Sequence, residues 1–417
     1  MSNPTWPTTP LSKLTSRIGD GIHGTPVYCE NGGYPFVNGN NLKSGAIEIS
    51  KDTKRVSQEE YEKYFIEFDD KTLFLSINGT LGNLAKYQDE EMVLGKSAAY
   101  IKCTDINIDF LYYYFQLKEV KSLMWNVATG STIKNLSLAS IRNMEIPTPP
   151  EDVAKKIADV LSAIDKKIEL NNRINAELEA MAKTLYDYWF VQFDFPDDSP
   201  QGQGKPYKTS GGKMVYNPTL KREIPEGWCD ASLVDIATFT NGIACQKYYP
   251  TGDEPTYKVI KIREFSSGFD DSSESVHRGV PEKVVVNDGD ILFSWSATLE
   301  VKLWAGGTGA LNQHIFKVTS ENYPKTFYYF EVLKYLEYFK MVAELRKTTM
   351  GHITKDHLVT SRICLPPKEL IQAMDAKLSP ILSKVISNSQ QNAELEQLRD
   401  WLLPMLMNGQ VTVGEAS

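Results

Sequence analysis

The feature that most constrains this chain is an internal repeat. The pentapeptide NAELE occurs at 175–179 and again, 217 residues later, at 392–396. The same offset aligns positions that step by three and four residues, as on the a/d seam of a coiled coil. The repeat therefore predicts two long helices of one pattern. Their seam positions are Leu161, Ile164, Ile168, Asn171, Asn175, Leu178, Ala182 and Leu185 in the first copy, and Leu378, Ile381, Val385, Asn388, Asn392, Leu395, Arg399 and Leu402 in the second.

The segments in front of these helices also correspond, with a few residues inserted or deleted. YPFVNGNNLKSG at 34–45 matches YKVIKIREFSSG at 257–268, LFLSINGTLG at 73–82 matches ILFSWSATLE at 291–300, and Gly130 with Lys134 matches Gly351 with Lys355. A proline pair precedes each helix, where the missing amide donor of proline costs nothing. We therefore predict a domain at 1–150, a helix at 151–195, a linker at 196–225, a second domain at 226–366, and a second helix with a C-terminal tail at 367–417.

Each predicted domain mixes strands with helices. YPFVNG, TLFLSIN and SAAYIKC are rich in β-branched and aromatic residues and lie between Gly and Asn breaks, which is typical of strands. DFLYYYFQLKEVKSLM at 109–124 and KTFYYFEVLKYLEYFKMVAEL at 325–345 predict helices near the ends of the domains. The predicted fold class is α+β, with two tandem α+β domains that are each followed by a long helix.

Charge and motif spacing exclude several classes of protein. The net charge of −8 excludes a histone-like polycation, although DNA binding depends on where the basic groups lie. Five scattered cysteines without a CxxC disfavour a disulfide framework or a zinc ribbon. Gly95-Lys96-Ser97 does not end a phosphate-binding loop, because Glu90 stands where that loop needs its first glycine. The chain has no HExxH, no apolar run of membrane-helix length and no signal-peptide order at its start. We therefore expect a cytoplasmic, non-catalytic binding protein with no metal site.

The chain resembles the specificity subunits of type I restriction–modification systems. The resemblance lies in the order domain–helix–domain–helix, in the Ile146-Pro147 and Leu365-Pro366 exits into a helix, and in the linker GKPYKTSGGKMVYNPTLKREIPEGW. It implies that each domain is a target recognition domain reading one half of a split, asymmetric DNA site. It also implies that the two helices form an antiparallel coiled coil with pseudo-two-fold symmetry, which spaces the domains.

The same resemblance implies the partners of the chain. Two methylation subunits, which bind S-adenosylmethionine, would dock on the helices. A motor-nuclease subunit that uses ATP would join them, and this chain itself would hold no cofactor.

Given DNA as the ligand, amide, hydroxyl and basic side chains of the domains are the candidate contacts. Asn pairs with adenine and Arg or Lys with guanine, whereas Ser, Thr and Lys mostly bind phosphate. The alternative is that these are turn residues and a solvated surface. The candidates are Asn38, Asn40, Asn41, Lys43, Asn78, Thr80, Lys86, Ser131, Thr132 and Lys134 in the first domain, and Lys258, Lys261, Arg263, Ser296, Thr298, Arg346, Lys347, His352 and Lys355 in the second, with the turn Asn312-Gln313-His314 as a further candidate.

The aromatic clusters allow two interpretations. Tyr112, Tyr113, Tyr114 and Phe115 could stack on bases, but helix core is the favoured interpretation, as strand core is for Trp295. Two apolar clusters, at the ends of the helices, are either intramolecular core or a docking patch: Tyr186, Tyr188, Trp189 and Phe190, and Leu403, Met405 and Met407.

Four asparagines are predicted to set the register of the helix pair. If the helices are antiparallel, Asn171 faces Asn392 and Asn175 faces Asn388. Buried Asn pairs lower stability but fix register.

Two alternatives to DNA recognition remain open. The chain could be a two-headed protein-interaction scaffold on a coiled-coil stem. It could also be a modification enzyme acting alone, although no residues are left over for a cofactor-binding domain.

Overall fold

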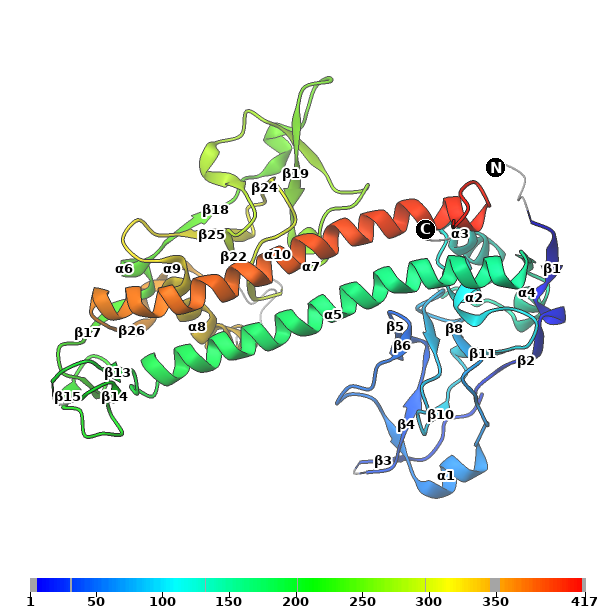
Figure 1. Cartoon of the computed structure of the whole chain (residues 1–417), viewed down its shortest axis with the longest axis horizontal. Helices are drawn as coiled ribbons and strands as arrows, with labels where there is room; N and C mark the ends of the chain where they lie inside the picture. The colour runs from blue at the N-terminus through cyan, green and yellow to red at the C-terminus, as the bar shows by residue number, and fades with distance from the viewer. Residues whose placement is uncertain are drawn as a thin grey trace. The chain divides into compact units, whose positions relative to one another are not determined.

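The computed structural model describes residues 6–30, 32–131, 133–200, 202–296, 298–345 and 353–414. The chain forms two compact units, the first made of Met1–Lys166 with Leu395–Ser417 and the second of Lys167–Glu394. The division falls within both long helices, α5 (Glu151–Phe190) and α10 (Lys368–Met407). Each unit therefore combines one mixed domain with a part of both helices (Figure 1).

The two predicted long helices are confirmed. Each has 40 residues, which corresponds to about 60 Å at 1.5 Å per residue. In the second unit, Asn171 Nδ2 donates to Asn392 Oδ1 at 2.8 Å, and Asn388 Nδ2 donates to Asn175 Oδ1 at 2.9 Å. All four amides are buried. The predicted pairing is confirmed, and it shows that the helices run antiparallel there.

In the first unit the same two helices also run antiparallel. Arg399, at a predicted seam position, donates from Nη1 to Asp165 Oδ1 at 2.9 Å, and Tyr113 donates to the other oxygen of Asp165 at 2.6 Å. Leu161, Leu403 and Met407 are buried in the hydrophobic core of this unit.

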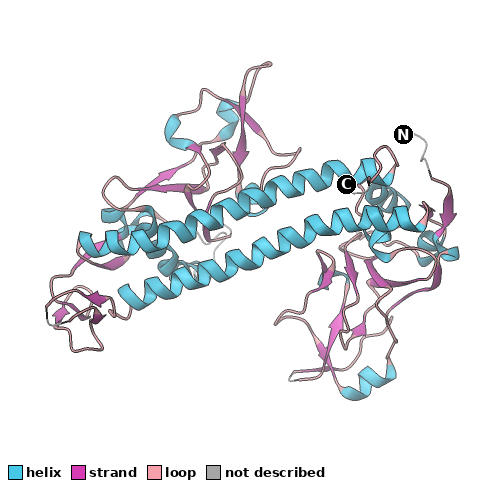
Figure 2. Cartoon of the chain, in the orientation of Figure 1, coloured by secondary structure: helices cyan, strands magenta, loops and turns pink. Residues whose placement is uncertain are grey.

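The first domain contains two four-stranded sheets (Figure 2). One is antiparallel, in the order β2-β11-β8-β9, and the other has the order β10-β4-β7-β3 with β10 and β4 parallel. The strands are β1 (Thr8–Pro10), β2 (Thr15–Asp20), β3 (Tyr28–Cys29), β4 (Tyr34–Val37), β5 (Leu42–Lys43), β6 (Ala46–Ile47), β7 (Arg55–Val56), β8 (Thr72–Ser76), β9 (Leu84–Lys86), β10 (Val93–Leu94), β11 (Ala98–Cys103) and β12 (Glu145–Pro147). The helices are α1 (Gln58–Lys63), α2 (Ile108–Tyr114), α3 (Lys118–Val127) and α4 (Leu138–Arg142).

The second domain repeats this plan. Its antiparallel sheet has the order β18-β25-β22-β23, and its other sheet, β20-β19-β24-β21, contains the parallel pair β19 and β24. The strands are β17 (Cys229–Ser232), β18 (Thr238–Asn241), β19 (Thr256–Ile260), β20 (Ser275–His277), β21 (Val285–Val286), β22 (Ile291–Ser294), β23 (Glu300–Leu303), β24 (Gly309–Leu311), β25 (Ile315–Thr319) and β26 (Arg362–Leu365). The helices are α6 (Leu233–Ile236), α7 (Ile262–Ser267), α8 (Lys325–Leu345) and α9 (Lys355–Thr360). The predicted α+β class is confirmed for both domains.

The tyrosine-rich segments of both domains are helical. The first segment forms two helices, α2 and α3, because the helical hydrogen bonding is interrupted at 115–117, and the second forms the single helix α8. Tyr112, Tyr113 and Phe115 are buried in the core of the first unit. The interpretation of this cluster as helix core is therefore confirmed.

The segment between α5 and the second domain forms two small hairpins. They consist of β13 (Pro196–Asp197) with β14 (Lys205–Pro206), and β15 (Met214–Asn217) with β16 (Arg222–Pro225). Phe195 stacks on both Tyr207 and Trp228, with ring centroids 4.7 and 5.3 Å apart. These rings continue the packing of the second unit into the predicted linker.

The two apolar helix ends contribute mainly to the cores of their units. Tyr186, Trp189 and Phe190 are buried in the second unit, and the Tyr186 hydroxyl donates to Glu331 Oε1 at 2.7 Å. Tyr188 remains partly exposed. In the part of the chain that the structure describes, no helix is long and apolar enough to cross a membrane.

Candidate nucleic-acid interface

Three of the predicted contact segments of the first domain meet at the ends of β4 and β8. Gly39 packs so closely on Ser76 that a Cβ at this glycine would lie 2.1 Å from Ser76 Oγ. Backbone bonds then join the neighbouring turns: Ile77 N donates to Ser97 O at 2.9 Å, and Leu136 N donates to Ile77 O at 2.9 Å. We call this surface the first loop edge, made of residues 38–41, 76–80, 95–97 and 129–137.

The second domain builds its edge with the same backbone bonds. Trp295 N donates to His314 O at 3.4 Å, and Ile353 N donates to Trp295 O at 3.0 Å, as Ile77 and Leu136 do in the first domain. Asn312 N donates to Ile260 O at 3.1 Å, where Gly95 N donates to Val37 O at 2.8 Å. We call this surface the second loop edge, made of residues 260–263, 294–296, 311–314 and 353–355. The two edges share one backbone frame and differ in their side chains.

This frame corrects one match within the repeat. Lys355 is the first residue of α9 after the cap Thr354, and Leu138 is the first residue of α4 after the cap Ser137. Lys355 therefore corresponds to Leu138, and its predicted match with Lys134 is wrong.

The asparagines of the first edge differ in their availability. Asn41 is buried, and its Nδ2 donates to Glu48 O at 3.0 Å and to Thr53 Oγ1 at 3.2 Å. Asn38 accepts from Ser97 Oγ at 2.9 Å. Asn40 is exposed at the tip of the turn between them. Asn38 and Asn41 thus shape the turn, and Asn40 is the amide that the turn presents to solvent.

The other polar candidates of the first domain divide by position. Asn78 pairs with Asn135 in a short antiparallel bridge, and Thr80 Oγ1 lies 2.9 Å from Ser76 Oγ. Ser131 is exposed nearby, and Thr132 lies outside the described residues. Asn78, Thr80 and Ser131 belong to one surface, the first loop edge.

The three lysines of the first domain have different neighbours. Lys43 forms an ion pair with Glu48 at 2.7 Å. Lys86 forms one with Asp109 at 2.6 Å and lies over the ring of Tyr112. Lys134 instead lies over the exposed ring of Trp125, with Nζ 5.6 Å from the centroid. Lys134 is therefore the lysine of this group that the structure holds beside the edge without an ion pair to a described carboxylate.

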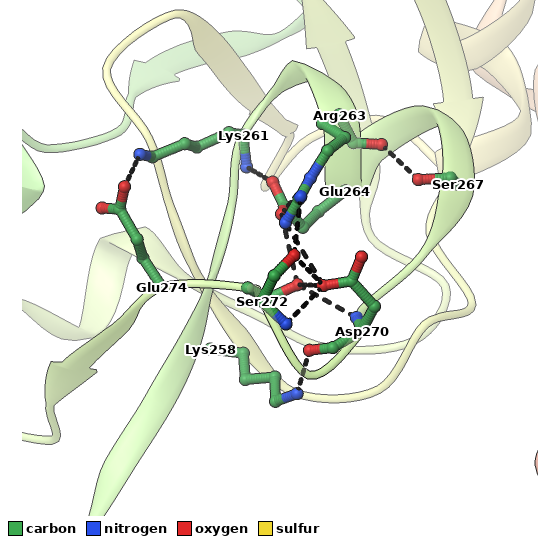
Figure 3. A network of polar contacts seen from close by, with 9 residues as sticks. Lys258, Lys261, Arg263, Glu264, Ser267, Asp270, Ser272 and Glu274 are labelled. Carbon is green, nitrogen blue, oxygen red and sulfur yellow. Dashed lines mark hydrogen bonds and ion pairs between the residues drawn. The ribbon is translucent and has the colours of Figure 1, made fainter. Parts of the chain in front are cut away.

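In the second domain, a polar network binds the three basic candidates near α7 (Figure 3). Lys261 forms an ion pair with Glu274, and Lys258 donates to the backbone oxygen of Asp270. The hydrogen bond from Lys261 is the main cause that lowers the pKa of Glu274, and the bond from Ser272 is the main cause that lowers the pKa of Asp270. Lys261 is thus paired with a carboxylate of this network, whereas Lys258 is held by an uncharged backbone oxygen.

Arg263 is the most heavily bonded residue of this network. Its Nε and Nη2 donate to the buried carboxylate of Glu264, Nη2 also donates to Asp270, and Nη1 donates to Ser272 Oγ at 2.8 Å. The bond with Glu264 is the main cause that raises the pKa of Arg263. A guanidinium has five N–H donors, so four are engaged and one is left. Bidentate contact with guanine needs two donors and would require one of these bonds to break.

Three of the remaining hydroxyl and basic candidates of the second domain lie within the described residues. Ser296 is buried, whereas Thr298 and Lys355 are exposed. The exposed Gln313 and the half-buried His314 form the turn between β24 and β25. Arg346, Lys347 and His352 lie outside the described residues.

A cavity beside the second edge was not predicted from the sequence. It has a volume of about 500 Å³ and lies between β18, the end of β22 and α9. Trp295 Nε1 donates to Asn241 Oδ1 across its wall at 3.0 Å. Trp295 packs only partly on the core, so its interpretation as strand core misses this cavity. Phe239 and Asn241 carry no sequence signal by themselves, because only folding brings β18 beside Trp295.

The described residues offer no candidate metal site, and two buried cysteines have raised thiol pKa values. None of their His, Cys, Asp and Glu side chains form a group of three that could hold a metal ion. Burial raises the pKa of Cys103 to about 12 and that of Cys364 to about 11, which disfavours their thiolates at neutral pH.

Two domains with one frame and two different polar edges define a class of two-headed recognition protein. A family model for the type I restriction modification DNA specificity domain matches residues 24–180 and 225–397. The chain therefore belongs to the family of type I restriction–modification DNA specificity subunits. This family is the non-catalytic DNA-recognition subunit of these systems, and the chain accordingly carries two target recognition domains. The two alternatives, a protein-interaction scaffold and an enzyme acting alone, do not describe this family.

Individual relatives agree with this assignment. The MjaIX specificity subunit of Methanocaldococcus jannaschii is 26% identical over 315 residues, which cover 74% of this chain and 70% of the relative. The HindI specificity subunit of Haemophilus influenzae is 23% identical over 331 residues, covering 68% of this chain and 72% of the relative. A crystal structure of the S subunit from M. genitalium has a TM-score of 0.57 at 14% identity and covers 100% of this chain and 98% of its own. That last likeness concerns the fold.

Proposed function

We propose that the two loop edges read the two halves of a split, asymmetric DNA site. The observation that carries this proposal is the repeated backbone frame with different side chains. One frame docks two segments of duplex in the same way, and different side chains then recognise different bases.

The exposed Asn40 and Lys355 and the half-buried Lys134 supply contacts of the two edges. Asn40 presents an amide suited to adenine, and Lys134 and Lys355 are suited to phosphate. Asn38, Asn41 and Ser296 act mainly by shaping the turns, since side-chain hydrogen bonds or burial tie them to the protein, and the backbone of Asn78 bridges to Asn135. Lys258, Lys261 and Arg263 approach DNA as parts of the braced loop.

The helices and the partner subunits complete the proposal. The paired asparagines fix the register of α5 and α10, so that the helices hold the two domains at a set spacing. Two methylation subunits with S-adenosylmethionine dock on the helices, and a motor-nuclease subunit with ATP joins them in the cytoplasm. The recognition domains are exchangeable at the predicted boundaries, 1–150 and 226–366.

Methylation mapping tests this function directly. In host DNA modified by a complex containing this chain, every methylated site should consist of two different half-sites separated by a constant spacer. The purified complex should bind that sequence more tightly than random duplex in a gel-shift assay. A symmetric site, or methylation without a constant spacer, would contradict the proposal.

A further inference from the structure

The cavity beside the second loop edge has the make-up of a binding pocket. Its volume of about 500 Å³ falls in the range of small-ligand sites. Three rings contribute to its wall: Trp295, Phe316 and Phe239, with Trp295 and Phe316 centroids 5.7 Å apart. Asn241 and Lys355 add polar groups and are exposed to solvent. The pocket is therefore apolar and aromatic inside and polar where it opens.

The orientation of the Asn241 amide follows from its neighbour. The indole Nε1 of Trp295 is a donor only, so Asn241 must turn its oxygen toward it, as the 3.0 Å bond shows. The Nδ2 group of Asn241 then has its two donors available for a ligand. Such a group recognises ring nitrogens and carbonyl oxygens of a heterocycle.

The first domain has an arginine at the corresponding position of its short helix. Arg142 of α4 donates from Nη2 to the backbone oxygen of Ile18 at 2.8 Å. Ile18 lies opposite Ile101 in its sheet, as Phe239 lies opposite Val318. The residue of α9 that corresponds to Arg142 is Val359, whose side chain has no hydrogen-bond donor. The second domain thus has the ring of Phe239 where the first has Ile18, and the apolar Val359 where the first has a guanidinium.

We propose that this pocket takes one nucleobase of the second half-site, displaced from the base stack. This rests on the proposed function of the loop edges, because Trp295 belongs to both the edge and the pocket. The rings of Trp295 and Phe239 offer flat apolar surfaces for the base, and the Asn241 amide binds its acceptors. The Lys355 ammonium at the rim meets the displaced phosphate. The first domain, with Arg142 in place, reads its bases in the stack.

The test uses the full-length chain assembled with its methylation subunits, and duplexes that carry the mapped site. In a series of duplexes, each base of the second half-site in turn faces an abasic nucleotide and so has no pairing partner. An unpaired base leaves the stack at lower cost, so wild type should bind about tenfold more tightly than to matched duplex when one particular base is orphaned. All other positions should show no such gain.

Val359→Arg places the guanidinium of the first domain on α9 next to Leu358, which lines the pocket, and should abolish the gain. Val359 is 44% exposed, so the substitution leaves the core intact, which equal thermal unfolding temperatures would verify. Trp295→Ile, which installs the residue of the first domain, should abolish the gain as well. Val359→Thr, a control of similar size, should keep it.

The outcomes separate the pocket from the proposed function. A wild-type complex that prefers its mapped site but gains affinity at no orphaned base overturns the pocket alone, and so does a Val359→Arg complex that keeps the gain. A wild-type complex with no sequence preference for matched duplex overturns the proposed function, and the pocket with it.

Discussion

The two recognition domains agree in their backbone and differ in their edges. Ile77 and Trp295 occupy one place in the frame, and both bond the following strand and turn through the same backbone groups. In the short helix of each domain, Lys355 replaces Leu138 at the first residue, and Val359 replaces Arg142 four residues later. The backbone hydrogen bonds therefore position each edge, whereas the side chains above them can differ between the domains. In the proposed function, this difference lets the two edges recognise different bases.

Exchanging residues 1–150 for the first domain of another specificity subunit is expected to have the largest effect. One half-site should change completely, because each mismatched base pair costs about 1–3 kcal/mol and a half-site contains several. The other half-site and its methylation should stay the same. Sequencing of methylated sites gives the answer. As a control, exchange of 226–366 should change the other half-site. A change of both half-sites in either chimera would contradict the proposal that each domain reads one half.

Asn171→Ala tests the proposal that the paired asparagines fix the register of α5 and α10. The substitution leaves the buried Asn392 Oδ1 without its donor and should lower the free energy of unfolding by about 1–3 kcal/mol. Denaturant unfolding measures this loss. Asn171→Leu combined with Asn392→Leu should recover the stability but loosen the register, seen as a variable spacer in the methylated sites. Asn40→Ala, at an exposed turn, should leave stability unchanged, and an equal loss there would contradict this account.

Arg263→Ala distinguishes a base reader from a brace. Since four of its donors are engaged within the loop, we expect a lower thermal unfolding temperature and equal weakening on specific and random DNA. Glu264→Gln should act in the same direction, because it removes the carboxylate that holds the guanidinium. A loss of about tenfold or more that is confined to one base position would instead identify Arg263 as the reader that the sequence predicts.

Lys134→Ala and Lys355→Ala are expected to have the smallest effects. Each should weaken binding to all sequences alike and lower the slope of log affinity against log salt by about one unit, as for one lost phosphate contact. Salt titrations of binding measure this slope. Lys43→Ala is the matched control, because its ammonium is already paired with Glu48 and should change the slope less. An effect confined to one half-site position would instead identify that lysine as a base contact.

Much of the architecture could be predicted from the sequence, because it depends on periodicity and on repetition. The seam spacing around Asn171 and Asn392 predicted both helices and their pairing. This was possible because the a/d positions of a coiled coil are the positions that face the partner helix. The α+β class followed from strands such as 72–76 and 98–103. The match of Lys355 with Lys134 was wrong because it relied on the identity of two residues in a short motif. The structural correspondence depends instead on helix caps and backbone hydrogen bonds.

The candidate site was less predictable, because the sequence identifies residue types but not their neighbours. Asn40 and Asn41 are adjacent and alike in the sequence, yet one is exposed and the other is buried under two hydrogen bonds. The sequence suggests that the Arg263 guanidinium is available to bind DNA, whereas in the structure it already donates to Asp270 and Ser272. We therefore expect a basic residue to contact DNA only where no carboxylate of its own loop already pairs with it.

The sequence by itself determined the order of domains and helices, the antiparallel Asn pairs and the family of the protein, since each of these is carried by residues close together or by a repeat. Only the tertiary structure decided which polar side chains reach solvent, and that a cavity opens beside Trp295. Both depend on contacts between segments far apart in the chain, such as β18 with α9. The physical reason is that burial and hydrogen-bond partners are properties of three-dimensional neighbours, which no local pattern of residues records.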